Sequence, residues 1–235
     1  MLNIGCSTDT MKRVQTLAPG EFYHIYNRGV LKRKIFLDDR DRARFLLSLL
    51  YFQGPETIDN PGRLVTRYVE HRMFNTDRAM EEKITRERGL RLIAFALMPN
   101  HFHLIAEEVK EGGISKYMQR VGNSYTKYFN TKYQASGYLF QGAFKFSHIG
   151  DNEQLLYASA YIHRNCCELT GWRNKAHEYP WSSYQDFLSK NRWSNLLHTE
   201  PIREQFAKSD DYHEWVQTSG AKDLAEIVEH PMFNS

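Results

Sequence analysis

The stretch LRLIAFALMPNHFHLIAEE, residues 90–108, decides the fold. Two apolar runs, 90–98 and 101–108, flank Pro99 and Asn100, which suit the two central positions of a β-turn. Apolar runs of this length on either side of a tight turn are typical of a β-hairpin. The sequence therefore predicts two adjacent antiparallel strands.

Further strands and helices are expected on both sides of this hairpin. Strand-like alternation occurs at 21–30 and 137–150, and helical spacing of apolar residues occurs at 38–53, 115–133 and 152–171. The second of these helices is predicted to begin at an N-cap, Ser115. The order strand, helix, hairpin, helix, strand, helix predicts an α+β antiparallel sheet with helices packed on one face, close to a ferredoxin-like arrangement.

Other segments are predicted to lie outside this scaffold. Residues 1–20 lack periodicity and end in Pro-Gly, which indicates an N-terminal arm. Residues 54–90 are polar and charged, and we expect an inserted, partly helical segment within a main domain of residues 21–189. Residues 190–235 carry short helical patterns and predict a small helical C-terminal extension, packed on the body or standing apart.

Charge and cysteine content narrow the class of protein. The 235 residues carry a net charge of +3, and residues 186–235 hold five Lys/Arg against nine Asp/Glu, so a charge of +7 lies on the rest. A basic body suits a polyanionic ligand. Three cysteines do not make a disulfide framework, and no apolar run approaches the ~20 residues of a membrane helix. We expect a cytoplasmic protein without a membrane anchor.

Two histidines in the hairpin are candidate metal ligands. Side chains at i and i+2 of a strand point the same way, so His101 and His103 can form a two-pronged ligand. Alone, the pair reads more often as two ordinary strand histidines. A catalytic ion also needs at least one further protein ligand.

The helix at 152–171 offers that ligand. Tyr157, Tyr161 and Asn165 are spaced four apart and therefore share one helical face. Asn165 can ligate a hard metal, while Tyr161 presents a phenol to whatever the metal binds. Tyrosines at helical spacing are, however, commonly core residues with the hydroxyl at the rim.

Several motifs together resemble a known family. MPNHFHLI, NSYTKYFNTKYQASGYLFQGAFK, YIHRN and YPWSSYQDFL occur in the order and at the spacings of the HUH single-tyrosine transposases, the IS200-like family. The chain is most similar to the REP-associated tyrosine transposases, and YHIYNRG near the start is also similar to that branch. The resemblance covers about residues 21–189 and implies the ferredoxin-like, or RRM-like, HUH fold.

The resemblance assigns roles to the candidate residues. It implies that His101, His103 and Asn165 hold Mg²⁺ or Mn²⁺ and that Tyr161 is the nucleophile. The sequence departs from the family at two places. Cys166 stands where a proline commonly follows the asparagine, and Tyr179 stands before Pro180 in a Trp-Pro-x-Ser type signature.

The implied function is a transposase. Such an enzyme cleaves and rejoins single-stranded DNA near palindromic hairpins through a covalent 5′-phosphotyrosine, as a monomer or a homodimer. A phenol has a pKa near ~10 and is a poor nucleophile until the metal polarises the phosphate. Basic residues that could contact DNA phosphates are Arg28, Lys32, Arg33, Lys34, Lys116, Arg120, Lys127 and Lys145.

Three alternatives stay open at this point. Tyr157 and Tyr161 could act as the two nucleophiles of a Rep- or relaxase-like nickase. The chain could be a domesticated DNA-binding regulatory protein that keeps the fold without turnover. It could also be a zinc-bound structural or hydrolytic module.

Overall fold

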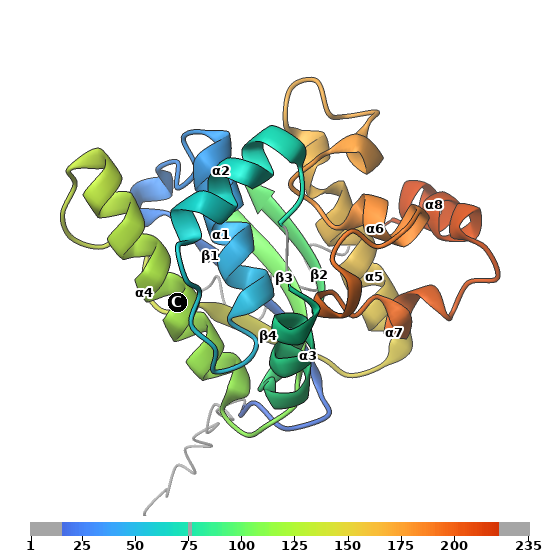
Figure 1. Cartoon of the computed structure of the whole chain (residues 1–235). Helices are drawn as coiled ribbons and strands as arrows, with labels where there is room; N and C mark the ends of the chain where they lie inside the picture. Colours follow the sequence, from blue (N-terminus) through green and yellow to red (C-terminus); the bar gives the residue numbers. More distant parts are fainter. Residues whose placement is uncertain (1–15, 75–76, 221–235) are drawn as a thin grey trace, which may run out of the picture.

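The fold is built on one four-stranded sheet (Figure 1). The computed structural model describes residues 16–74 and 77–220, so most of the predicted N-terminal arm and the last part of the predicted extension lie outside the described residues. The sheet is antiparallel in the order β2-β3-β1-β4. The strands are β1 (Phe22–Arg28), β2 (Leu90–Met98), β3 (His101–Glu108) and β4 (Lys145–Ile149).

The predicted hairpin is confirmed, and its turn is anchored by the loop after β1. Met98 pairs with His101 across the two-residue turn. The backbone N–H groups of Ile35 and Phe36 donate to the Pro99 carbonyl at 2.9 and 3.1 Å. These long-range bonds hold the turn, and with it the start of β3, in one place.

Two long helices cover one face of the sheet. They are α1 (Asp39–Tyr51) and α4 (Gly113–Tyr133). The ring of Phe45 in α1 lies 5.0 Å, between centroids, from Phe102 of β3 and 5.0 Å from Tyr125 of α4. All three rings are buried, so this face forms the main hydrophobic core.

The third long helix lies on the opposite face of the sheet. The prediction that the helices pack on one face is therefore wrong for this helix. The ring of Tyr161, in α5 (Asn152–Arg164), contacts His103, whose side chain points away from that of its neighbour Phe102. The ferredoxin-like order itself, strand, helix, hairpin, helix, strand, is confirmed. A local period shows that a helix has an apolar face but does not say which side of a sheet it covers.

Helix α4 begins earlier than its sequence predicts. Its first residue is Gly113 rather than a residue after Ser115, because the buried carboxylate of Glu108 accepts bonds from the N–H groups of Gly113 and Ile114 at 3.0 and 2.7 Å. A carboxylate at this position also complements the helix dipole. Only glycine fits at 113, since a Cβ there would meet the Gly89 carbonyl oxygen at 2.0 Å.

The segment 54–90 is partly helical. It contains α2 (Pro61–His71) and α3 (Arg78–Glu87). Tyr68 of α2 is buried, and its ring centroid lies 5.8 Å from that of Trp181 and 5.9 Å from that of Trp193. The inserted segment therefore packs against the C-terminal part of the chain.

The described residues of the C-terminal part, up to Gly220, pack on the body instead of standing apart. Trp215 lies 5.0 Å, between ring centroids, from Tyr157 of α5. The short elements here are α6 (Tyr184–Leu188), α7 (Glu200–Arg203) and α8 (Ser209–Thr218). Within the described residues, 3-10 helices also occur at Val30–Lys32, Asn165–Glu168, Ala176–Glu178 and Ser194–Leu196.

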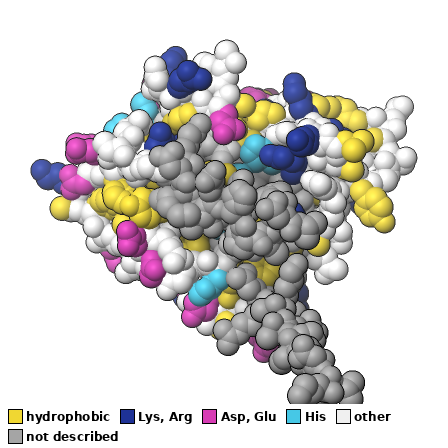
Figure 2. Space-filling model, turned by 180° about the vertical axis from the view of Figure 1, so that it is seen from behind, with side chains coloured by type: hydrophobic (Ala, Val, Ile, Leu, Met, Phe, Trp, Pro, Cys, Tyr) yellow, Lys and Arg dark blue, Asp and Glu magenta, His cyan; other side chains and the backbone are white. Residues whose placement is uncertain are grey.

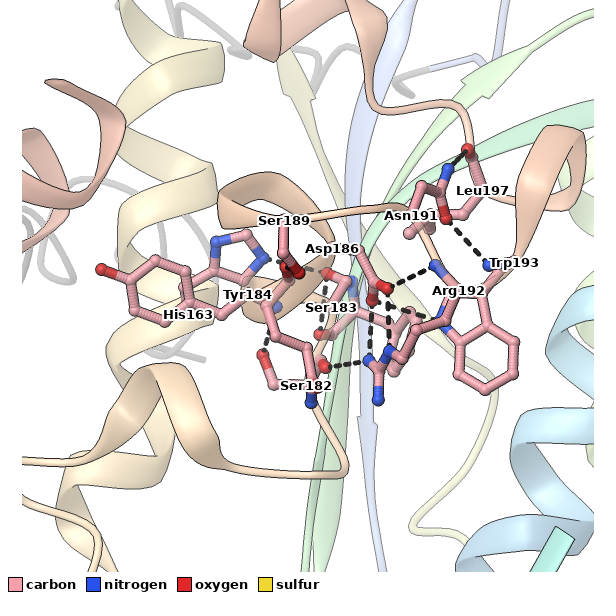
Figure 3. A network of polar contacts seen from close by, with 12 residues as sticks. His163, Ser182, Ser183, Tyr184, Asp186, Ser189, Asn191, Arg192, Trp193 and Leu197 are labelled. Carbon is pink, nitrogen blue, oxygen red and sulfur yellow. Dashed lines mark hydrogen bonds and ion pairs between the residues drawn. The ribbon is translucent and has the colours of Figure 1, made fainter. Parts of the chain in front are cut away.

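The motif YPWSSY joins β2 to α5. Leu97 N–H donates to the Trp181 carbonyl at 2.9 Å, and Ser183 N–H donates to the Phe95 carbonyl at 3.0 Å, so the motif covers the free edge of β2. The Ser183 hydroxyl also lies 2.9 Å from Nε2 of His163 (Figure 3). Helix α5 is thereby tied to the sheet.

The described residues contain no helix that combines the length and the apolar character needed to span a membrane.

Candidate functional site

The two strand histidines lie on the α5 face of the sheet. His101 and His103 flank Phe102, whose side chain enters the core on the other face. Their rings are nearly perpendicular, at 88°, with centroids 5.0 Å apart. His103 is 4% exposed and His101 is half-buried, so the pair lies at the border between core and surface.

The hydrogen bonds around His101 determine which ring nitrogen carries the proton. The Asn100 amide nitrogen donates to the Lys32 carbonyl at 3.2 Å, which leaves the Asn100 oxygen to face Nδ1 of His101 at 2.7 Å. Because a carbonyl oxygen can only accept, the Nδ1 of a neutral His101 carries the proton. Its Nε2 therefore keeps a lone pair.

That lone pair faces the side chain predicted to be the third ligand. Nε2 of His101 lies 3.1 Å from Oδ1 of Asn165. Two ligand atoms at about 2.1 Å from one octahedral ion are about 3.0 Å apart, so the pair has the spacing of two donors to a Mg²⁺-sized cation. Two facing acceptors repel each other unless a positive charge lies between them. The residues present therefore fit a small divalent cation.

The ligand set would have an unusual composition. Within 16–74 and 77–220, no group of three or more His, Cys, Asp or Glu side chains is placed to hold a metal ion. An ion at this site would take two imidazoles and an amide oxygen, all neutral. These ligands would not neutralise the positive charge of the ion, which would therefore attract an anionic ligand such as a phosphate.

His24 is a site residue that the sequence prediction missed. Its Nε2 lies 2.8 Å from Nδ1 of His103, and the two rings are stacked at 5.1 Å and 14°. His24 is fully buried, so it holds the His103 ring in one orientation. When Nδ1 of His103 carries the proton of this hydrogen bond, Nε2 of His103 keeps its lone pair for a metal ion. Metal-binding histidines commonly donate their other ring N–H to a partner in this way.

Tyr161 and Tyr157 have different surroundings. The Tyr161 ring is edge-on to His103 at 5.4 Å and to His24 at 5.9 Å. The Tyr157 ring, one turn earlier, instead packs against Trp215 of α8. The structure therefore brings Tyr161, and not Tyr157, to the histidines.

Asn165 lies just beyond the end of α5. The chain continues there as a 3-10 helix, and the Asn165 N–H donates to the Ile162 carbonyl. Cys166, where the family commonly has proline, is buried with its sulfur 3.6 Å from the His163 carbonyl. Asn165 itself has helical backbone angles, is 5% exposed and points toward His101.

Burial keeps two of the site histidines, His24 and His103, neutral. It lowers the pKa of His24 to about 3 and lowers the pKa of His103 well below its usual value. The nearby His24, His101 and Arg28 lower the pKa of His103 further. The neutral imidazole is the form that ligates a metal ion, so these side chains are ready to do so at neutral pH.

The buried histidines predict acid sensitivity of the fold. The pKa values of His24 and His163 are both lowered to about 3 by burial, against 6.5 in an unfolded chain. The unfolded chain therefore binds more protons below pH 6.5, and stability is complete above that pH and falls below it. We expect the free energy of unfolding to drop by about 2 kcal/mol per buried histidine between pH 7 and pH 5.

Urea unfolding at the two pH values measures this drop. His163→Gln should reduce the pH dependence by one histidine's share. A free energy of unfolding that is equal at pH 7 and pH 5 would contradict the prediction.

The predicted DNA-contacting residues divide into two groups. Six of them are exposed: Arg28, Lys32, Lys34, Lys116, Lys127 and Lys145. Arg33 and Arg120 are half-buried, and their side chains make contacts within the chain. Arg33 donates to the Tyr138 carbonyl at 3.2 Å, and Arg120 donates to the Gly54 and Glu56 carbonyls and lies over the Phe52 ring.

Arg28 is the exposed basic residue with the clearest relation to the site. It pairs with His101 in the sheet, so the two side chains emerge on the same face. Figure 2 shows the side of the molecule opposite to Figure 1, where a histidine lies beside Lys or Arg side chains. Arg28 therefore adds a positive charge on the face of the sheet that carries His101.

Comparison with known proteins agrees with this fold. The fold is similar to that of a solved structure, the REP-associated tyrosine transposase bound to a REP hairpin, with a TM-score of 0.52 and 13% identity over 78% of this chain and 88% of that chain. No curated protein matches the chain. Residues 65–165, which include all four predicted metal and nucleophile positions, match the family model described as "Transposase IS200 like". The predicted resemblance to IS200-like transposases and the predicted α+β fold are thereby confirmed.

Proposed function

We propose that the chain is a metal-dependent transposase that cleaves and rejoins single-stranded DNA next to palindromic hairpins. One observation carries the proposal: Tyr161 and Asn165 of one segment meet His101 and His103 of another on one face of the sheet. The family match supports the transposase class, and the similar structure is of a protein bound to a REP hairpin. We infer that the enzyme works in the cytoplasm, as a monomer or a homodimer.

Each residue of the site has a distinct task. Nε2 of His101, Nε2 of His103 and Oδ1 of Asn165 would hold Mg²⁺ or Mn²⁺. Such an ion, when bound, draws electron density from the oxygens of the scissile phosphate. Asn100 and His24 keep the two imidazoles in position through their Nδ1 atoms. The site is therefore arranged to present a phosphate to Tyr161.

The chemical step is a transesterification at phosphorus. The Tyr161 phenol oxygen attacks, a bond forms between that oxygen and phosphorus, and the bond from phosphorus to the 3′ oxygen breaks. The phenol loses its proton and the departing oxygen gains one, which leaves a 5′-phosphotyrosine and a free 3′-OH. Attack by another 3′-OH reverses the exchange, so rejoining needs no ATP.

A trapping assay tests the proposal. The full chain is incubated with an oligonucleotide that carries a hairpin flanked by single strand, and the products are separated on a denaturing gel. We expect a protein–DNA adduct with Mn²⁺ or Mg²⁺ that EDTA abolishes. DNA binding without any adduct would favour the regulatory alternative. One tightly bound zinc and no adduct would favour the zinc module.

A further inference from the structure

A second site is suggested by a cavity on the other face of the sheet. The cavity has a volume of about 1070 Å³ and lies between α4 and the loop at 137–144. From α4 it is lined by Lys116, Gln119, Asn123, Thr126, Lys127 and Asn130, among others. These residues form one polar stripe along the helix, which is otherwise packed on the core.

The lining has the chemistry of a nucleic-acid site. It includes two exposed lysines, Lys116 and Lys127, and none of the described residues that line it is acidic. A positive lining attracts phosphates, and the amides and hydroxyls of the stripe can bond with base edges. The rest of the lining is mostly apolar, so the cavity combines positive charge and hydrogen-bonding groups with apolar surface, and this combination suits the phosphates and the bases of a nucleic acid.

The opposite wall offers aromatic rings. Tyr138 is 86% exposed, which is unusual for so large a side chain, and Phe140 and Phe144 are half-buried beside it. Exposed rings along a basic groove are the usual stacking partners of unpaired bases. Paired bases in a duplex have no free faces, so the wall suits a single strand.

The cavity lies close to the metal-binding residues through the sheet. Asn27 of β1 pairs with Phe102 of β3, and both line the cavity. The next pair along the strands is Arg28 with His101, whose side chains point to the other face. One DNA strand that passes the end of β1 at Arg28 would therefore reach both faces.

We propose that this cavity binds unpaired nucleotides of the DNA strand whose phosphate is cleaved at His101, His103 and Tyr161. The inference rests on the proposed function and adds a second site at which the protein contacts its DNA substrate. Lys116 and Lys127 neutralise phosphates, the α4 stripe contacts base edges, and Tyr138 stacks on a base. Substrate selection is thereby divided between the two faces of the sheet.

Gly122 provides a test that does not disturb the fold. It lies in the middle of α4 and lines the cavity, and a Cβ placed there meets no atom within 4 Å. Gly122→Met should fill part of the cavity, while Gly122→Ala adds only one methyl group. Both changes replace a helical glycine with a better helix former, so neither should lower the melting temperature.

Binding is measured by fluorescence anisotropy with a labelled single-stranded oligonucleotide in EDTA, which separates binding from cleavage. We expect Gly122→Met to weaken binding about tenfold or more, the loss from one unstacked base, and Gly122→Ala to bind as the wild type does. Wild-type affinity in Gly122→Met overturns the cavity proposal. An RNA strand that competes as well as the DNA overturns the choice of ligand.

The lysines give an independent measurement. Lys116→Ala and Lys127→Ala should each reduce the slope of log affinity against log salt by about 0.7, because each releases one fewer counterion from a single strand. Lys190→Ala, at an exposed position outside the cavity, should leave the slope unchanged. Slopes equal to that of the wild type would overturn the proposal. A wild type that forms the covalent adduct while all cavity variants bind normally would leave the proposed function intact.

Discussion

Replacing Tyr161 by phenylalanine is expected to abolish the covalent protein–DNA adduct, and Tyr157→Phe is expected to leave it at the wild-type level. The substitution removes only the phenol oxygen, which is the proposed nucleophile. The ring that lies edge-on to His103 and His24 is kept. Loss of a covalent nucleophile costs at least about 10³-fold in rate, so residual cleavage should be undetectable on a gel.

Tyr157→Phe is the matched control for this experiment. It makes the same chemical change one helical turn away, where the ring faces Trp215. Adduct formation is measured on denaturing gels with both variants at equal melting temperatures. An adduct that persists in Tyr161→Phe would reject the assignment. Loss of adduct in both variants would favour the two-tyrosine nickase.

Asp186→Ala is expected to lower the free energy of unfolding by about 3–5 kcal/mol. Asp186 is fully buried, and its carboxylate accepts bonds from the backbone N–H and the guanidinium of Arg192 at 2.7 to 2.9 Å (Figure 3). It also accepts a bond from the Trp193 indole at 3.1 Å. Truncation would leave all of these donors, including a partly buried positive charge, without their acceptor.

Urea unfolding at neutral pH measures the loss. Glu204→Ala removes a carboxylate from an exposed position and should change stability by no more than about 0.5 kcal/mol. A loss below about 1 kcal/mol in Asp186→Ala would show that the network does not hold this region. The Arg192 guanidinium also donates to the Ser182 carbonyl, so the network supports the YPWSSY motif that covers β2 and is tied to α5.

Local patterns in the sequence were enough to predict the elements that carry the site. Pro99 and Asn100 between two apolar runs predict the hairpin, because turn and strand preferences act over a few residues. The i, i+2 spacing of His101 and His103 predicts a shared direction for the same reason. The α+β class follows from the order of such elements, since few topologies connect them without crossings.

Contacts between distant segments were decided only by the tertiary structure. The period of α5 shows an apolar face but not that it packs on the sheet face opposite to α1 and α4. The four-residue spacing of Tyr157 and Tyr161 puts both on one helical face. It does not predict that Tyr157 packs against α8 while Tyr161 contacts the histidines.

His24 shows most clearly that contacts between distant segments cannot be predicted from local sequence patterns. It lies 79 positions from His103, and nothing in its own strand marks it as a partner. The sequence by itself determined the strands, the helices and the residues available for chemistry, because those depend on backbone preferences and short-range periodicity. Which of these residues meet was decided by burial of the core and by the register of β1 against β3, since both depend on the packing of the whole chain.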